Sequence, residues 1–196
     1  KRILDIYKNR KKEKYKLKTE LRKLIKINCF TKNGEKVLLM GNIEQPEETK
    51  KAIDQGADGI GLFRSEFLFI NKENVPSEEE QFLAYKKVAV DMRGLPVTIR
   101  TLDSGADKTL PYLHDKKEQP NNPALGLRAV RLCLAQTDIF VAQLKAILRA
   151  SAYGDVKILL PLISGSNEVV ACRKLIKHAK DQLKNHYGGL KYGKRI

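Results

Sequence analysis

Short apolar runs alternate with longer amphipathic segments along most of this chain, a pattern typical of strands that alternate with helices. Four apolar runs have the length and composition of buried strands, at residues 37–40, 59–63, 96–101 and 156–163. Between and after them lie segments with helical spacing or helix start signals, at residues 45–56, 77–92, 125–134, 138–153 and 166–185. This alternation predicts an α/β fold with a parallel sheet and helices outside it.

A lysine-rich helix is predicted before the first strand, and we interpret it as a connector. We therefore divide the chain into a basic connector helix, residues 1–27, and an α/β domain, residues 28–196. The last three residues, Lys194-Arg195-Ile196, are typical of a strand start, so the chain is expected to stop before a fifth strand is complete. Four such units fit either an open sheet or the first half of an eight-stranded barrel, and spacing alone does not choose between them.

The net charge of +15 is concentrated at the two ends of the chain. Residues 1–26 hold 12 Lys and Arg against 3 Asp and Glu, and residues 174–196 hold 7 against 1, so the body between them is neutral. A neutral body argues against a basic groove built into the fold. We do not expect a nucleic-acid partner, although a basic arm that touches nucleic acid or an acidic protein stays open as an alternative.

The composition, 42% hydrophobic and 31% charged, is that of a globular protein. No apolar run approaches the roughly 20 residues of a membrane-spanning helix, and residues 1–14 lack the apolar core of a signal peptide. A soluble cytoplasmic protein is therefore expected, without a membrane partner. Cys29, Cys133 and Cys172 have neither metal-ligand spacing nor a disulfide framework, and we expect them to be reduced core thiols.

Arginines end two of the predicted strands. Arg64 follows the run 59–63, Arg100 ends the apolar part of 96–101, and Arg128 follows Gly126 in a stretch expected to be helical. The carboxyl ends of parallel strands meet at one edge of a sheet, where α/β folds bind ligands.

Guanidinium groups bind phosphate or carboxylate oxygens in bidentate pairs and stay charged at physiological pH. Two unit charges about 4 Å apart repel by roughly 4 kcal/mol at an effective dielectric constant of about 20. The three arginines therefore predict a polyanionic ligand. For the first segment, a simple ion pair between Arg64 and Glu66 at the strand end is the alternative.

A polar segment without a convincing period, residues 103–122, follows Arg100, and loops of this length are usually functional. In it Asp103 could orient Arg100, and Lys108 could contact a phosphate; Glu66 is a further supporting candidate. The alternative is that Asp103 and Asp107 only neutralise nearby basic residues or cap a turn.

Four motifs, in this order and spacing, closely resemble enzyme I of the phosphoenolpyruvate-dependent sugar phosphotransferase system. They are GADGIGLFRSEFLF (56–69), PSEEEQFLAYKKV (76–88), RTLDSGADKTLPY (100–112) and NPALGLRAVRLCL (122–134). The resemblance covers about residues 15–196. Phosphoenolpyruvate (PEP) synthase and pyruvate phosphate dikinase share a looser form of the first motif and stay open as alternatives, as does a non-catalytic regulatory or interaction module with basic arms.

The resemblance implies a (β/α)8 TIM-type barrel that binds PEP and Mg²⁺, with about the first half of the barrel in this chain. It implies that Arg64, Arg100 and Arg128 bind PEP. The phosphoryl group then passes to a histidine on a separate domain and on to the carrier protein HPr, releasing pyruvate. The full-length protein is expected to be a homodimer.

The same resemblance implies that the metal ligands and the cysteine that protonates the enolate of pyruvate lie beyond Ile196. No catalytic or metal-binding residue is therefore assigned in this chain, and His114, His178 and His186 are expected on a loop and on a helix surface. We expect the fragment alone to be inactive. We also expect it to dimerise or aggregate, because half a parallel barrel leaves a strand edge unpaired.

Overall fold

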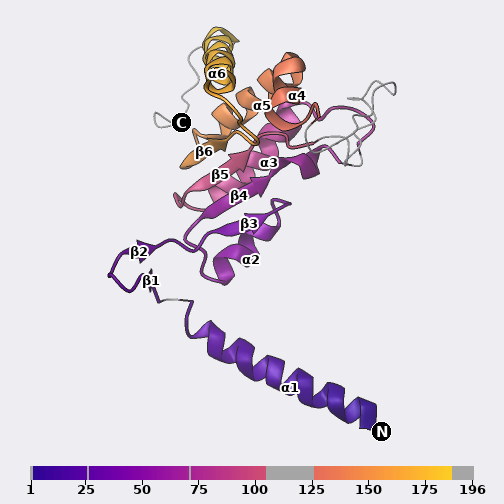
Figure 1. The fold of residues 1–196 in the computed structure, drawn as a ribbon, viewed down its shortest axis with the longest axis vertical. Helices are drawn as coiled ribbons and strands as arrows, with labels where there is room; N and C mark the ends of the chain where they lie inside the picture. The colour runs from indigo at the N-terminus through magenta and orange to yellow at the C-terminus, as the bar shows by residue number, and fades with distance from the viewer. Residues whose placement is uncertain (1, 26, 71, 105–125, 187–196) are drawn as a thin grey trace.

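A four-stranded parallel sheet lies at the centre of the computed structural model, which describes residues 2–25, 27–70, 72–104 and 126–186 (Figure 1). Its strands are β3 (Gly41–Ile43), β4 (Ile60–Arg64), β5 (Val97–Arg100) and β6 (Val156–Leu159). They pair in the order β3-β4-β5-β6, so that neighbours in the sheet are also consecutive in the sequence. The predicted α/β class and parallel sheet are confirmed.

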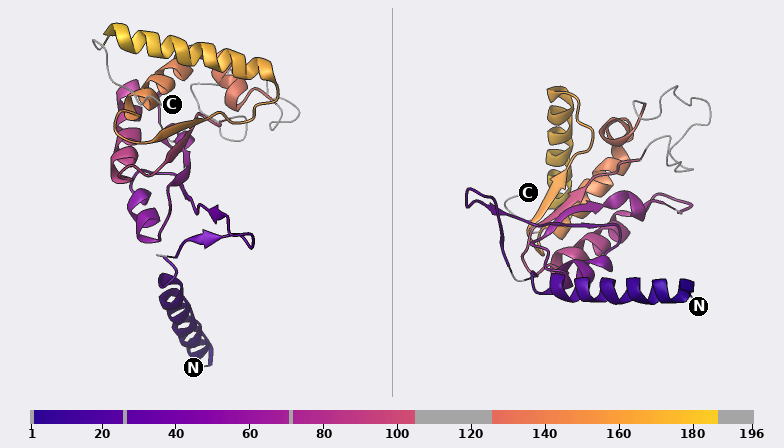
Figure 2. Two further views of the ribbon diagram at one scale, coloured as in Figure 1. Left: turned by 90° about the vertical axis from the view of Figure 1, so that its left-hand side faces the viewer. Right: turned by 60° about the horizontal axis from the view of Figure 1, so that its bottom comes forward.

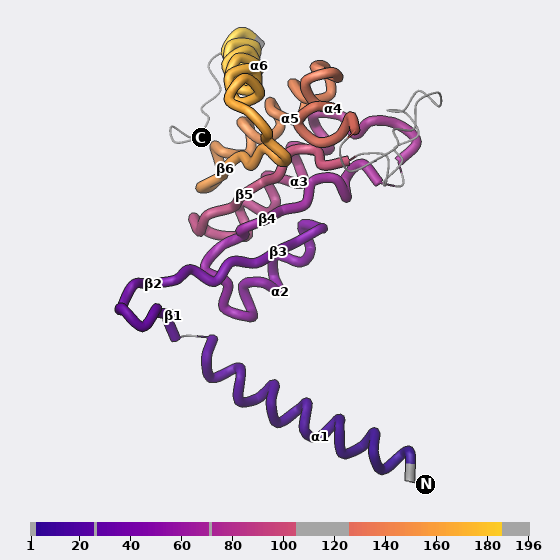
Figure 3. Tube along the Cα trace, viewed as in Figure 1, coloured from indigo at the N-terminus to yellow at the C-terminus, as the bar shows by residue number. Residues whose placement is uncertain are grey.

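Helices connect these strands and follow the last one, as Figure 3 traces along the chain. They are α2 (Glu48–Asp54), α3 (Glu78–Asp91), α4 (Ala129–Ala135), α5 (Thr137–Ala150) and α6 (Ser166–His186), with a short 3-10 helix η1 (Ser65–Leu68) directly after β4. The start of α3 is as predicted. Ser77 is its N-cap, and its hydroxyl and the Glu80 carboxylate form a capping box with each other's backbone N–H groups.

The main core lies between one face of the sheet and the helices α3 and α5. It joins side chains from every strand of the sheet to both helices: Ile43, Ile60, Phe63, Val97, Ile99, Val156, Phe82, Tyr85, Val88, Ala89, Met92, Ala146, Ile147 and Ala150. On the other face, Leu62, Thr98 and Leu159 are half-buried and Lys157 is exposed. Among the described residues the two faces of the sheet therefore differ, since a close-packed core covers the face toward α3 and α5 and not the other.

The predicted lysine-rich helix is present as α1 (Arg2–Arg22), which projects away from the rest of the molecule (Figure 2). Its large apolar side chains, Ile3, Leu4, Ile6, Tyr7, Tyr15, Leu17 and Leu21, are exposed. A small antiparallel hairpin of β1 (Cys29–Phe30) and β2 (Lys36–Val37) links α1 to the sheet, with a turn at 32–34 between its strands.

The predicted strand at residues 37–40 is wrong in position. Val37 belongs to the hairpin, and the strand that enters the sheet begins four residues later, at Gly41. Leu38 and Leu39 are more than half exposed, and the backbone of Leu39 pairs with the side chain and backbone of Asp58. Met40 instead lies against the sheet at Gly61, where a Cβ added to the glycine would come 2.7 Å from the Met40 Cβ. Most of the apolar run is therefore a connecting segment that lies beside the sheet.

The prediction that Arg128 lies on a helix is also wrong. Arg128 has extended backbone angles, φ −147° and ψ 167°, and is the residue before α4. Ala129 follows with φ +50°, a conformation that costs an L-residue roughly 1–2 kcal/mol, and its N–H donates to the Ser104 carbonyl at 3.1 Å. Because of this tertiary hydrogen bond to the segment after β5, α4 begins at Ala129 and Arg128 lies outside the helix. The strand predicted at residues 194–196 lies outside the described residues.

Candidate anion-binding site

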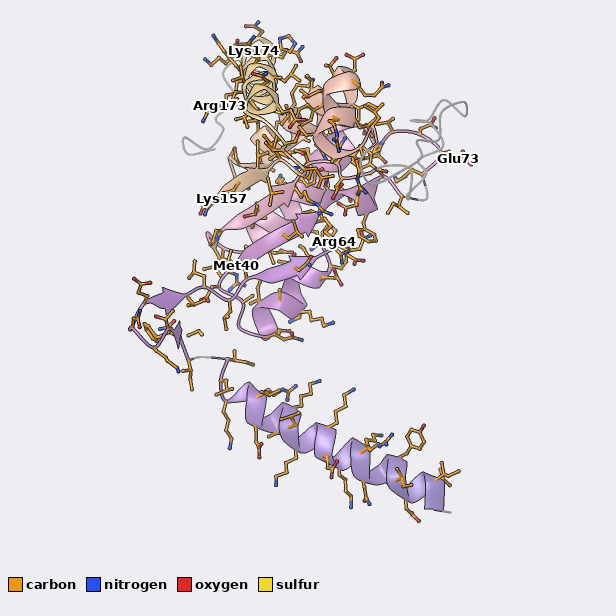
Figure 4. The ribbon with its side chains drawn as sticks, viewed as in Figure 1. Met40, Arg64, Glu73, Lys157, Arg173 and Lys174 are labelled. Atoms are coloured by element: carbon orange, nitrogen blue, oxygen red, sulfur yellow. The ribbon has the colours of Figure 1, made fainter. Side chains whose placement is uncertain are left out.

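Arg64 and Arg100 occupy directly paired positions at the carboxyl ends of β4 and β5. The same pairing aligns Phe63 with Ile99 one step earlier, and both of these side chains are buried in the main core. Because side chains alternate along a strand, the two arginines project from the opposite face of the sheet. Figure 4 places Arg64 at the end of the sheet away from Met40 and Lys157. The expectation of two arginines at adjacent strand ends is confirmed.

Arg64 contacts a carboxylate and an aromatic ring. Its guanidinium donates to the Glu44 carboxylate, which directly follows β3, and lies 5.1 Å from the centre of the Phe67 ring. Glu44 is itself fixed through its backbone N–H, which donates to Glu48 at 2.7 Å and holds the pKa of the Glu48 carboxyl below its usual range. With about a third of its side chain exposed, Arg64 is the most accessible of the three candidate arginines.

Arg100 and Arg128 are linked through one carboxylate. Arg100 donates to Glu66, which is 1% exposed, and its Nη1 lies 3.0 Å from Asp103. The other oxygen of Asp103 lies 3.2 Å from Nη2 of Arg128. Asp103 therefore orients Arg100, as the sequence suggested, and also brings Arg128 to the same end of the sheet.

These ion pairs remove one argument that the sequence offered for a polyanionic ligand. The repulsion between three guanidinium groups is met by three carboxylates of the protein itself, from Glu44, Glu66 and Asp103. Repulsion alone therefore does not require a polyanionic ligand. The alternative ion pair between Arg64 and Glu66 is wrong as well, since each of these residues pairs with another partner.

The site keeps donor capacity for a ligand. Within the described part of the chain, the buried Nε atoms of Arg64 and Arg100 have no hydrogen-bond partner. A phosphate or carboxylate could bind these guanidinium groups by displacing a protein carboxylate. This displacement is easiest at Arg64, because its partner Glu44 is also about a third exposed. Bidentate binding of an anion is the chemistry that this arrangement offers.

The structure brings together five of the six candidate residues: Arg64, Arg100, Arg128, Glu66 and Asp103. Lys108 lies outside the described residues. Sequence reasoning missed Glu44. The signal that could have found it is the rule used for the arginines, because Glu44 directly follows the neighbouring strand and so reaches the same edge of the sheet.

Each carboxylate of the site forms an ion pair with at least one arginine. Within the described residues, no group of three or more His, Cys, Asp or Glu side chains is placed to hold a metal ion. None of the helices in the described part of the chain is both long and apolar enough to cross a bilayer. His178 is exposed on α6, as expected.

Residues 18–196 match the family described as PEP-utilising enzyme, PEP-binding domain. The chain belongs to this family.

Curated relatives of this chain include proteins named phosphoenolpyruvate-protein phosphotransferase. The protein of Staphylococcus epidermidis is 45% identical over 177 residues, which is 90% of this chain and 31% of that protein. The protein of Cupriavidus necator is 46% identical over 182 residues, 92% of this chain and 31% of that protein. The protein of Geobacillus stearothermophilus is 46% identical over 166 residues, 85% of this chain and 28% of that protein. The resemblance drawn from the four motifs is confirmed, and the chain spans about a third of the length of these relatives.

Proposed function

We propose that this chain is the arginine-bearing part of the PEP-binding domain of a phosphoenolpyruvate-protein phosphotransferase. In the full-length protein the phosphoryl group of PEP would pass to a histidine of a separate domain and then to an HPr-type carrier, with release of pyruvate. The names of the relatives favour this reaction over those of PEP synthase and pyruvate phosphate dikinase.

The observation that carries the proposal is the pairing of Arg64 with Arg100 at neighbouring strand ends, with Arg128 joined to Arg100 through Asp103. Phosphoryl transfer has a loose transition state in which charge spreads over the three equatorial oxygens. Guanidinium groups fixed around that position stabilise the charge without reorganising during the reaction. The carboxylates that orient them in turn keep the forks in place before the substrate arrives.

Two features support a barrel. The strands follow one another across the sheet in chain order, whereas a doubly wound sheet reverses its order at a switch point. The main core also lies on one face of the sheet, as in a barrel whose other face becomes the interior. We therefore propose that residues 28–196 form about the first half of a (β/α)8 barrel, and that residues 1–27 connect it to another part of the protein.

The proposal includes Mg²⁺ as the metal of the full-length protein, a homodimer and a cytoplasmic location. We expect the ligands of Mg²⁺ to lie outside the described residues. Since the chain covers 31% of the length of the S. epidermidis and C. necator proteins, we expect it not to transfer the phosphoryl group by itself.

The test is the rate at which the full-length protein takes up the phosphoryl group of PEP. Arg64→Ala and Arg100→Ala should each lower this rate by at least about a hundredfold, as removal of a donor to developing charge does in other enzymes. The matched control is Arg173→Ala on α6, an exposed arginine that Figure 4 shows far from Arg64.

The control should keep the wild-type rate. Wild-type rates in both Arg64→Ala and Arg100→Ala would rule out the proposed site. An equal loss in Arg173→Ala would show that the effect comes from lost positive charge in general.

A further inference from the structure

A buried amide lies directly beneath the arginine site. Gln143 belongs to α5 and is 1% exposed. Its Oε1 accepts a hydrogen bond from the backbone N–H of Leu102 at 2.9 Å. Its Nε2 donates to the hydroxyl of Ser65 and to that of Tyr85, both at 3.0 Å. The carbonyl and both N–H groups of this side chain are therefore in use.

Each group in the hydrogen-bond network around Gln143 has a fixed role as donor or acceptor. The Ser65 hydroxyl accepts from Gln143 and donates to the carbonyl of Arg100 at 2.5 Å. The Tyr85 hydroxyl accepts from Gln143 and donates to Gln81 at 3.2 Å, whose amide donates in turn to the Pro76 carbonyl at 2.9 Å. Turning the Gln143 amide over would set its N–H groups against the N–H of Leu102. The network therefore has a single arrangement in which each of these groups is satisfied.

The contacts of Gln143 fall on the two strand ends that carry the arginines. Ser65 stands between Arg64 and Glu66 in the chain, and Leu102 immediately precedes Asp103. The Ser65 hydroxyl also holds the carbonyl of Arg100 itself. One side chain from a helix behind the sheet thus joins the Ser65 hydroxyl, beside Arg64, to the Leu102 backbone, beside Asp103.

We propose that Gln143 is a positioning residue of the PEP site, which sets the separation of the β4 and β5 ends and so the placement of Arg64 and Arg100. This inference rests on the proposed function. Gln143 acts through Ser65 and Leu102, and its contacts described above are to neither guanidinium. A misplacement of about 1 Å in a catalytic arrangement costs about a hundredfold in rate, so a small shift of the strand ends is enough to be measured.

The experiment compares buried substitutions in the full-length protein. Gln143→Met keeps the length of the side chain and removes all of its hydrogen bonds. Ile147→Val is the control for a core change one turn further along α5, in a side chain that is fully buried and apolar. Tyr85→Phe removes the link to α3 and leaves Gln143 bonded to Ser65 and Leu102.

Each variant is characterised by its melting temperature and by kcat and KM for phosphoryl transfer from PEP. We expect Gln143→Met to lower kcat by about ten- to a hundredfold with a change in KM of less than about threefold, because placement matters most in the transition state. Ile147→Val and Tyr85→Phe should keep kcat within about twofold of the wild type. If Gln143→Met does not fold, Ser65→Ala cuts the same connection between the strand ends and should show the same loss of kcat.

Two results would overturn the inference. One is a wild-type kcat in Gln143→Met, or in Ser65→Ala when that variant replaces it. The other is an equal loss of kcat in Ile147→Val, which would mean that loosening of the core is responsible. Arg100→Ala is measured beside them. If Arg64→Ala and Arg100→Ala both keep the wild-type rate, the proposed function fails; if Arg100→Ala is inactive while Gln143→Met is normal, only the role of Gln143 fails.

Discussion

Arg64 and Glu44 form an ion pair between the carboxyl ends of β4 and β3, across twenty positions of the sequence. Arg100 is paired to Glu66, which is almost wholly buried, whereas both members of the Arg64–Glu44 pair are about a third exposed. Glu44 therefore binds the Arg64 guanidinium, which is the most accessible of the three to solvent and to a ligand. A substrate anion that binds Arg64 competes with this carboxylate.

Replacing Glu44 with glutamine should strengthen substrate binding. Glu44→Gln removes the competing charge and keeps the shape of the side chain. Partly exposed ion pairs contribute about 0.2–1 kcal/mol, so the KM for PEP of the full-length protein should fall by roughly 1.5- to fivefold. Glu35→Gln, at an exposed position in the hairpin, makes the same change in net charge and should leave KM unaltered. A higher KM in Glu44→Gln would mean that Glu44 orients Arg64 for the substrate instead of competing with it.

Arg149 should contribute more to stability than its neighbour Lys145. The Arg149 side chain is 8% exposed, donates to Glu78 at 2.8 Å and to Glu79 at 2.5 Å, and lies 3.9 Å from the centre of the Phe82 ring. It thus ties α5 to the first turn of α3. Removing one partner of a buried ion pair typically costs about 3–5 kcal/mol, and since Glu79 is largely exposed we expect about 2–3 kcal/mol for Arg149→Met.

The measurement for Arg149→Met is the free energy of unfolding in urea. Lys145→Met serves as the comparison, since Lys145 contacts Glu78 at 2.6 Å from a more exposed position. It should cost less than about 1 kcal/mol. Equal losses in the two variants would show that the burial of Arg149 has no special effect.

The capping box of α3 should make stability depend on pH in acid. The Glu80 carboxylate accepts from the Ser77 backbone N–H and from the Lys72 side chain, and these bonds lower its pKa to about 2. A carboxyl whose pKa is lowered by folding stabilises the protein above its usual pKa of 4.5. This stabilisation is lost as the pH falls toward about 2.

Two variants test the capping box by urea unfolding at about pH 5 and about pH 2.5. Ser77→Ala removes the hydroxyl that caps Glu80 N and should cost about 1 kcal/mol at the higher pH. Glu80→Gln keeps an acceptor but no titrating group, so its difference from the wild type should shrink as the pH is lowered. A difference that stays constant over this range would contradict the assignment of the low pKa to Glu80.

The pattern of apolar runs and the geometry of parallel sheets were enough to predict the strand-end arginines. Arg64 and Arg100 each end an apolar run, and parallel strands bring their carboxyl ends to one edge whatever the details of packing. The helix start at Ser77 was predictable for a similar reason, because a capping box is formed by residues three apart. Both signals depend on short stretches of chain.

Contacts between distant segments could not be predicted in this way. The apolar run at residues 37–40 has the composition of a strand, yet Asp58 binds the backbone of Leu39 and displaces the strand to Gly41–Ile43. Likewise the bond from Ala129 to Ser104 keeps Arg128 out of α4. Helical or strand propensity is weaker than such tertiary bonds, so the boundaries shifted even where the elements exist.

The α/β class, the family and the place of Arg64 and Arg100 at adjacent strand ends could be read from the sequence, because periodicity and motif spacing are properties of short stretches of chain. Only the tertiary structure decided which carboxylate each arginine meets, with Glu44 on Arg64 and Glu66 and Asp103 on Arg100. It alone also places Gln143 beneath two strand ends that lie 78 and 41 positions away along the chain. Ion pairs and buried hydrogen bonds act over a few ångströms, and the distances between segments remote in sequence are set only when the chain is folded.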